Sequence, residues 1–264
     1  MEKIRILYLD ERLLVAYKPA GFDSQAEEGF DPDMVSALKK ELKARGESNL
    51  YIGVVHRLDK PVEGLLLYAR DKGMTADLCQ MIQKRQIKKY YCALVRGICP
   101  PQWSRAEGTR LENLLATDRR SGNAYVADGV CDETFADAKK AALLVWNVSD
   151  TADLIYGNFL KKCEQLPGEL LKCEAPAVHY HYREEDPMTE NALREDFSFV
   201  RICLETGRYH QIRTQLSHAG HPILGDRRYG QADEWNQVLR YPALCAYEIG
   251  FHHPVTGEWM TFRI

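Results

Sequence analysis

Four consecutive residues, His56-Arg57-Leu58-Asp59, place polar and charged side chains between apolar segments. Val54 and Val55 precede them, and Gly64-Leu65-Leu66-Leu67 follows shortly after. A carboxylate among apolar strands costs free energy unless it is paired or hydrogen-bonded. An ionised carboxylate held in such a place can act as a nucleophile or a general base. Taken alone, these residues favour a structural ion pair or a turn aspartate over catalysis, because structural pairs are common.

Two further polar clusters lie in the carboxyl-terminal third of the chain, at residues 206–213 and 218–226. If the chain is helical from residue 208 onward, His210 and Arg213 share one face. That face can equally be a solvated surface without a chemical role. The second cluster indicates a helix stop followed by a shaped loop, with a turn at Gly225-Asp226.

The elements that must position these clusters follow from hydrophobic periodicity and capping signals. The strands that we expect span residues 4–9, 13–17, 51–55, 64–69, 88–97, 197–205, 244–251 and 259–264. A helix should begin with Asp31 as its cap and Pro32 at its first position. A second helix should span residues 72–86, and residues 138–148 fit either a helix or a strand. The mixture predicts an α+β fold with a mixed, mainly antiparallel central sheet and flanking helices.

The overall composition is that of an ordinary folded protein, with 264 residues, 45% hydrophobic and 28% charged. It excludes a disordered chain or a coiled coil. No apolar run approaches the ~18 residues of a membrane helix, and no secretory signal is present, so we expect a cytoplasmic protein without a membrane partner. Residues 149–195 hold ten acidic and five basic residues and look like an insertion. They supply most of the acidity behind the formal net charge of −3, which predicts no strong general attraction to nucleic acid.

Four stretches in this order resemble the RluA type of RNA pseudouridine synthase. They are Leu14–Gly21 with its Lys-Pro-Ala-Gly turn, His56–Asp59 with the later Gly64–Leu67, Lys89–Gly97, and Leu204–Arg213 followed by Gly220–Asp226 and Tyr229-Gly230. The resemblance implies the pseudouridine synthase catalytic fold, as a single domain over residues 1–264 with the insertion at 149–195. The sequence departs from the family in three places. Val62-Glu63 stands where many members have Thr-Ser, and the insertion at 149–195 is larger than the family core requires. We also expect no separate amino-terminal RNA-binding domain of the kind that many relatives carry.

By this resemblance the chain isomerises uridine to pseudouridine in ribosomal or transfer RNA, and Asp59 is the catalytic aspartate. Arg213 matches the arginine that pairs with that aspartate, and a guanidinium there would hold the pKa of Asp59 down. Tyr91 matches the tyrosine of the pocket, and Arg57 matches the arginine that fills the gap left by an extruded base. The reaction is an isomerisation, so we expect no metal or other cofactor. RNA is the expected partner, and the chain is expected to be a monomer.

The predicted RNA contacts combine motif residues with two basic patches, because phosphate contacts are made by cationic side chains. They are Arg57, His56, Lys84, Arg85, Lys88, Lys89, Arg208, His210, Gln211, Arg227 and Arg228. The run from Lys84 to Lys89 is equally compatible with a solvated helix end. For Lys39, Lys40 and Lys43 we prefer an exposed helix face.

The residues by themselves leave three other functions open. A glycosidase would use Asp59 and Glu63 as a carboxylate pair. A metal site would draw on the pairs His179 with His181, His218 with His221, and His252 with His253, although no known zinc spacing joins them. A catalytically silent relative would bind RNA without converting it, which the presence of Asp59, Tyr91 and Arg213 disfavours.

Overall fold

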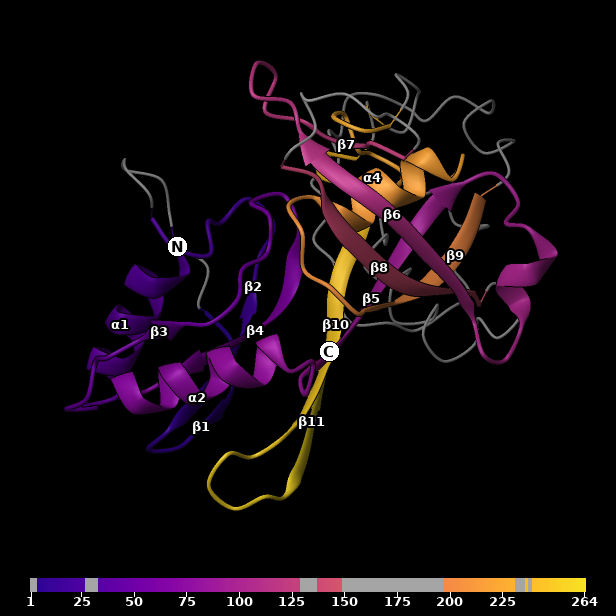
Figure 1. The fold of residues 1–264 in the computed structure, drawn as a ribbon. Helices are drawn as coiled ribbons and strands as arrows, with labels where there is room; N and C mark the ends of the chain where they lie inside the picture. Colours follow the sequence, from indigo (N-terminus) through magenta and orange to yellow (C-terminus); the bar gives the residue numbers. More distant parts are fainter. Residues whose placement is uncertain (1–3, 27–32, 129–136, 149–196, 231–235, 237–238) are drawn as a thin grey trace, which may run out of the picture. The chain divides into compact units, whose positions relative to one another are not determined.

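The structure, a computed structural model, describes residues 4–26, 33–128, 137–148, 197–230, 236 and 239–264 (Figure 1). The chain divides into two compact units. Unit 1 comprises Met1–Lys89 with Cys245–Ile264, and unit 2 comprises Tyr90–Leu244. The predicted insertion at 149–195 lies outside the described residues, and the predicted single domain stays a prediction.

Unit 1 is built on strands that come from both ends of the chain. They are β1 (Ile6–Leu9), β2 (Leu13–Lys18), β3 (Gly53–Val54), β4 (Glu63–Ala69), β10 (Leu244–His252) and β11 (Trp259–Arg263). The order β1-β2-β4-β10 is antiparallel except for the parallel β4–β10 pair, while β3 adds to β4 and β11 to β10. The expected strands near the amino terminus, at 64–69 and at the carboxyl terminus are therefore confirmed.

Two helices complete unit 1, α1 (Met34–Ala44) and α2 (Lys72–Gln83). Met74 and Leu78 of α2 are buried in a core with residues of β2, β4 and β10, so this helix covers one face of the sheet (Figure 1). Asp71 caps α2 by accepting from the Met74 amide at 2.8 Å. The prediction that Asp31 caps the first helix was wrong. Asp33 is its cap and accepts from the Ser36 amide at 3.0 Å, because that carboxylate stands next to the first helical residue.

Unit 2 holds an antiparallel sheet of order β5-β9-β8-β6-β7. Its elements are β5 (Lys88–Arg96), whose first two residues belong to unit 1, a short 3₁₀ helix (Pro101–Ser104), β6 (Thr109–Thr117), β7 (Ala124–Val126), β8 (Lys139–Asn147), β9 (Phe197–Leu204) and α4 (Gln211–His218). Residues 138–148, which fitted either a helix or a strand, thus form strand β8. The mixed, mainly antiparallel α+β architecture is confirmed in the two units.

No helix among the described residues is long and apolar enough to cross a membrane.

Gly64 allows β4 to lie against β10 in unit 1. Its φ is +129°, a region that side chains of L-residues rarely adopt, and a Cβ there would lie 2.3 Å from the carbonyl oxygen of Ala246. Gly64 pairs in register with Ala246, so this close approach is part of the parallel ladder. A glycine is therefore required at the start of β4.

Replacing Gly64 with alanine should destabilise unit 1 more than Gly46→Ala does. Gly46 also has a positive φ, +80°, but a Cβ added there would meet nothing within 4 Å. Gly46→Ala should therefore cost only the conformational strain, about 1 kcal/mol, whereas Gly64→Ala adds a backbone clash. Thermal and urea denaturation measure the difference. Equal losses of stability in the two variants would contradict the close approach.

Candidate active site

Asp59 lies on the short loop between β3 and β4, and its neighbours on both sides are anchored. The Ser24 hydroxyl donates to the Leu58 carbonyl oxygen at 2.8 Å and accepts from the Leu58 amide at 3.0 Å. On the other side, the Val62 amide donates to the carbonyl oxygen of Asp59 itself at 2.9 Å. The Asp59 residue is half-buried. These bonds fix the main chain that carries the carboxylate.

Lys18 ties the Lys-Pro-Ala-Gly turn to the same loop. Its ammonium is fully buried and donates to three carbonyl oxygens, those of Pro19, Phe22 and Lys60, at 3.1, 2.7 and 3.0 Å. Lys60 directly follows Asp59, and its carbonyl oxygen also accepts from the Gly21 amide at 2.8 Å. The buried ammonium thus holds two loops together, a role that a turn signal in the sequence does not indicate.

The charge of Lys18 is balanced by nearby carboxylates. Burial lowers the pKa of Lys18 to about 7, while the negative charges of Asp23, Glu63 and Asp59 act to raise it. The Asp59 carboxylate therefore lies in the field of a cation within its own unit when Lys18 is protonated. The buried carboxylate of Glu63 accepts a hydrogen bond from the Tyr17 hydroxyl.

His56 and Arg57 of the same motif have different environments. The Nε2 atom of His56 accepts from the Leu67 amide at 3.1 Å, which binds the loop to β4. Burial, reinforced by the charge of Lys89, lowers the pKa of His56 to about 3, so the imidazole is neutral at physiological pH. Arg57 is exposed. His56 therefore has a positioning role in unit 1, and its predicted contact with RNA stays a prediction.

Arg213 in unit 2 forms a buried, two-bond ion pair with Asp226. Its Nε and Nη2 atoms donate to the two carboxylate oxygens of Asp226 at 2.7 and 2.8 Å, and both residues are nearly inaccessible to solvent. The guanidinium also lies 4.9 Å from the centre of the Tyr229 ring. Asp226 further accepts from the amides of Arg228 and Tyr229 at 3.0 and 3.2 Å. One carboxylate thus shapes the loop after α4 and orients the arginine.

Tyr91 lies on β5 of unit 2 and is buried, next to Ile202 of β9 in the register. Asp59 belongs to unit 1, whereas Tyr91 and Arg213 belong to unit 2. The pairing of Asp59 with Arg213 therefore stays a prediction. Asp226 was interpreted from the sequence as a turn residue, and its role as a partner of Arg213 was missed.

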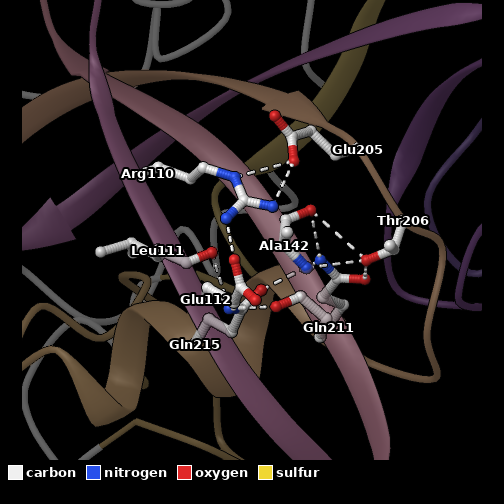
Figure 2. A network of polar contacts seen from close by, with 9 residues as sticks. Arg110, Leu111, Glu112, Ala142, Glu205, Thr206, Gln211 and Gln215 are labelled. Carbon is white, nitrogen blue, oxygen red and sulfur yellow. Dashed lines mark hydrogen bonds and ion pairs between the residues drawn. The ribbon is translucent and has the colours of Figure 1, made fainter.

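Gln211 is the centre of a buried polar network (Figure 2). Its amide oxygen accepts from the Thr206 hydroxyl at 2.8 Å and the Arg208 amide at 3.0 Å. Its amide nitrogen donates to the Ala142 carbonyl oxygen and to Gln215, both at 3.0 Å. Gln211 thereby joins α4 to β8 and to the turn that precedes the helix, while its predicted contact with RNA stays a prediction.

The helix that carries Arg213 begins at Gln211 rather than at residue 208. His210 is its cap residue and has a left-handed backbone, with φ of 51°, so it does not share a helical face with Arg213. Its Nδ1 atom lies 2.6 Å from the Tyr229 hydroxyl. Arg208 is exposed and donates to the carbonyl oxygen of Lys140 at 2.9 Å.

The predicted basic patches lie on the surface of their units. Lys84, Arg85 and Lys88 are exposed at the end of α2 and the start of β5, and Lys89 is half-buried. Arg227 and Arg228 are also exposed. Their guanidinium groups donate to main-chain oxygens, Arg227 to Asn236 at 2.6 Å and Arg228 to Gly122 at 2.8 Å. These two arginines thus brace loops, while their contact with RNA stays a prediction.

The histidines of the alternative metal site hold turns within the described part of the chain. His221 Nδ1 lies 3.0 Å from the carbonyl oxygen of Arg96, and His252 Nδ1 lies 2.9 Å from that of Gly257. His253 Nδ1 accepts from the amides of Val255 and Thr256. His179 and His181 lie outside the described residues. These contacts give His221, His252 and His253 structural roles.

Comparison with known proteins identifies the family. The family model described as RNA pseudouridylate synthase matches residues 12–218. The chain is 26% identical to ribosomal large subunit pseudouridine synthase C of Buchnera aphidicola, covering 97% of this chain and 65% of that protein. It is 27% identical to tRNA pseudouridine synthase C of Pasteurella multocida, covering 98% of this chain and 89% of that protein.

A solved structure supports the fold. Human RNA pseudouridylate synthase domain containing 1 superposes with a TM-score of 0.63 at 18% identity, covering 99% of this chain and 82% of that one. The chain spans about two thirds of the Buchnera protein and most of the Pasteurella protein. The match of the family model over most of the sequence, together with this fold, shows that the chain belongs to the RNA pseudouridylate synthase family.

Proposed function

We propose that this chain isomerises uridine to pseudouridine at specific sites in ribosomal or transfer RNA, with Asp59 as the catalytic aspartate. The observation that carries this proposal is the anchoring of the Asp59 loop by Ser24 and Lys18, in a motif of a family of RNA pseudouridylate synthases. A reacting group that is held in the geometry of the reaction lowers the activation barrier. The names of the similar proteins from Buchnera and Pasteurella support ribosomal and transfer RNA as the substrate classes.

The proposed reaction breaks one bond to the sugar and forms another. The bond between uracil N1 and ribose C1′ breaks, the base rotates, and a bond forms between C5 and C1′. The proton on C5 is released to solvent, and N1 gains a proton, so atoms balance without a redox step. Asp59 acts as nucleophile or as base in this sequence, both of which need an ionised carboxylate. Tyr91 is proposed to stack on the uracil and to assist proton transfer.

Arg213 is proposed to keep the Asp59 carboxylate charged. A guanidinium does not lose its proton in proteins, so it stabilises a neighbouring anion at every physiological pH. The bonds from Arg213 to Asp226 fix the direction of this guanidinium inside unit 2. Asp226 is therefore proposed as a positioning residue for the predicted catalytic arginine.

Extrusion of the target uridine from its stack is part of the proposal. Removing a base from a stack costs a few kcal/mol, and the planar cation of Arg57 is suited to fill the vacated space. Arg57 is exposed and lies on the same loop as Asp59, between β3 and β4. The exposed Lys84, Arg85 and Lys88 are proposed to bind phosphate groups of the same RNA.

Asp59→Asn should abolish conversion while leaving the fold intact, because an amide supplies neither a nucleophile nor a base. Release of tritium from carbon five of labelled uridine, assayed separately on transfer and ribosomal RNA, should fall by at least about 10²–10⁴-fold. The melting temperature should change little, because an amide has nearly the size of a carboxylate and Asp23 and Glu63 still balance the charge of Lys18.

Glu63→Gln is the control for a glycosidase, which would need both carboxylates. This variant should still release tritium, even if loss of the bond from Tyr17 lowers its stability. Wild-type binding to RNA without tritium release would favour a catalytically silent relative. Turnover by Asp59→Asn at a rate close to that of wild type would refute the role of Asp59.

Replacing Lys88 and Lys89 together with alanine should weaken RNA binding and flatten its dependence on salt. Each phosphate contact with a single strand contributes about 0.7 to the slope of log affinity against log salt concentration. Lys39→Ala with Lys43→Ala removes the same charge from the exposed side of α1 and serves as the control. Filter binding at several salt concentrations gives both slopes. Equal slopes for the two double variants would place the phosphate contacts elsewhere.

A further inference from the structure

Tyr209 is an exposed aromatic residue at the start of a buried segment of unit 2. About half of it, 51%, is open to solvent, whereas the six residues from Gln211 to Leu216 are buried. Tyr209 stands beside Arg208, whose side chain is also exposed. A single exposed aromatic residue needs no special explanation by itself. What distinguishes Tyr209 is the support beneath its ring.

One face of the Tyr209 ring is already stacked. The ring of His210 lies 3.7 Å away, centre to centre, at an angle of 21°. Stacking of two neighbouring residues requires both side chains to lie on the same side of the chain. In this arrangement His210 has a left-handed backbone, with φ of 51°. The stack orients Tyr209 before any ligand arrives.

His210 is in turn fixed by Tyr229. The two rings meet edge to face at 5.4 Å and 84°, and the His210 Nδ1 atom lies 2.6 Å from the Tyr229 hydroxyl. That hydroxyl also accepts from the Ala124 amide of β7 at 2.9 Å. The support of Tyr209 is therefore built into the sheet of unit 2, so its ring is preorganised for a stacking partner.

The same series of side chains reaches the predicted catalytic arginine. The guanidinium of Arg213 lies 4.9 Å from the centre of the Tyr229 ring, and Asp226 holds it from another side. Arg213, Tyr229, His210 and Tyr209 thus form a continuous row of planar groups from the buried ion pair to the surface. A group bound on Tyr209 would be placed at a defined position relative to Arg213.

Two tyrosines of this row directly follow an arginine in the sequence. Arg208 precedes Tyr209, and Arg228 precedes Tyr229 and is exposed. The guanidinium of Arg228 binds the turn between β6 and β7 at the Gly122 carbonyl oxygen, which keeps it in place beside that turn. An exposed, braced aromatic ring that follows an exposed arginine in the sequence suits a nucleobase with its phosphate, because stacking and charge can then act together.

We infer that Tyr209 is a stacking platform for an unpaired base of the substrate RNA other than the target uridine. The inference rests on the proposed function and adds a specific contact that the motif residues do not supply. Every nucleobase has a π-face, so the platform tolerates different bases. It contributes to holding the RNA rather than to the chemical steps.

Tyr209→Ala tests the platform, with Tyr209→Phe and Tyr209→Trp as variants that keep a ring. The alanine variant should raise the Kd for substrate RNA and the KM by about 5- to 150-fold, with the loss in KM rather than kcat. Both aromatic variants should stay within about threefold of wild type, because stacking needs no hydroxyl. The salt dependence of binding should be unchanged in all three, since no charge is removed.

Trp259→Ala is the matched control, because Trp259 is equally exposed, at 52%, and is not among the predicted RNA contacts. It should leave the Kd unchanged. As a direct signal, 2-aminopurine placed in turn at each unpaired position of the substrate RNA should be quenched by wild type at one position and be brighter there with Tyr209→Ala.

An unchanged Kd and KM in Tyr209→Ala would overturn the inference, and so would a Tyr209→Phe variant as weak as Tyr209→Ala. Circular dichroism of each variant shows whether the fold is kept. The proposed function fails separately, if the wild type binds RNA but releases no tritium. In that case the comparison of Kd values still decides whether Tyr209 stacks on a base.

Discussion

The buried guanidinium of Arg213 must be paired, and the loop after α4 in unit 2 is arranged to meet this requirement. Breaking a buried pair by removing one partner costs about 3–5 kcal/mol, because the remaining charge has no water around it. Asp226 meets this requirement with two parallel bonds and uses its remaining acceptor capacity on the amides of Arg228 and Tyr229. The loop after α4 is therefore arranged around one carboxylate, and the direction of the guanidinium follows from that loop.

In unit 1 a buried ammonium group, that of Lys18, likewise organises the main chain around it. Lys18 donates to three carbonyl oxygens, one of which belongs to the residue after Asp59. The Asp59 loop is thus fixed by hydrogen bonds from the buried Lys18 side chain and from the Ser24 hydroxyl. In both units a buried cation organises main-chain loops. Asp59 lies on one of these loops, and Arg213 of α4 is held by Asp226 of the other.

Much of the fold was predictable because it follows local patterns. The buried run of β4 and the apolar spacing of α2 identify these elements, and the motif order identifies the residues of the candidate site. Strands β6 and β7 were missed, since most of β6 alternates between half-buried and exposed residues without a continuous apolar run, and β7 has only three residues. The partners of Arg213 and Gln211 were missed for another reason. A sequence shows that Asp226 follows a turn glycine, but only the folded chain shows which cation its carboxylate faces. His210 was misplaced in the helix because the polar spacing of residues 206–213 does not show that its backbone is left-handed, which is uncommon outside glycine.

The central chemical claim is that Asp59 acts on the sugar of an extruded uridine with Arg213 beside it. A crystal structure of the chain bound to its substrate RNA tests this claim most directly. We predict a uridine outside its stack, with C1′ facing the Asp59 carboxylate, Arg57 in the vacated place, and an Arg213 nitrogen within about 4 Å of an Asp59 oxygen. A complex in which the uridine remains stacked, or in which Asp59 lies far from both the sugar and Arg213, would contradict it.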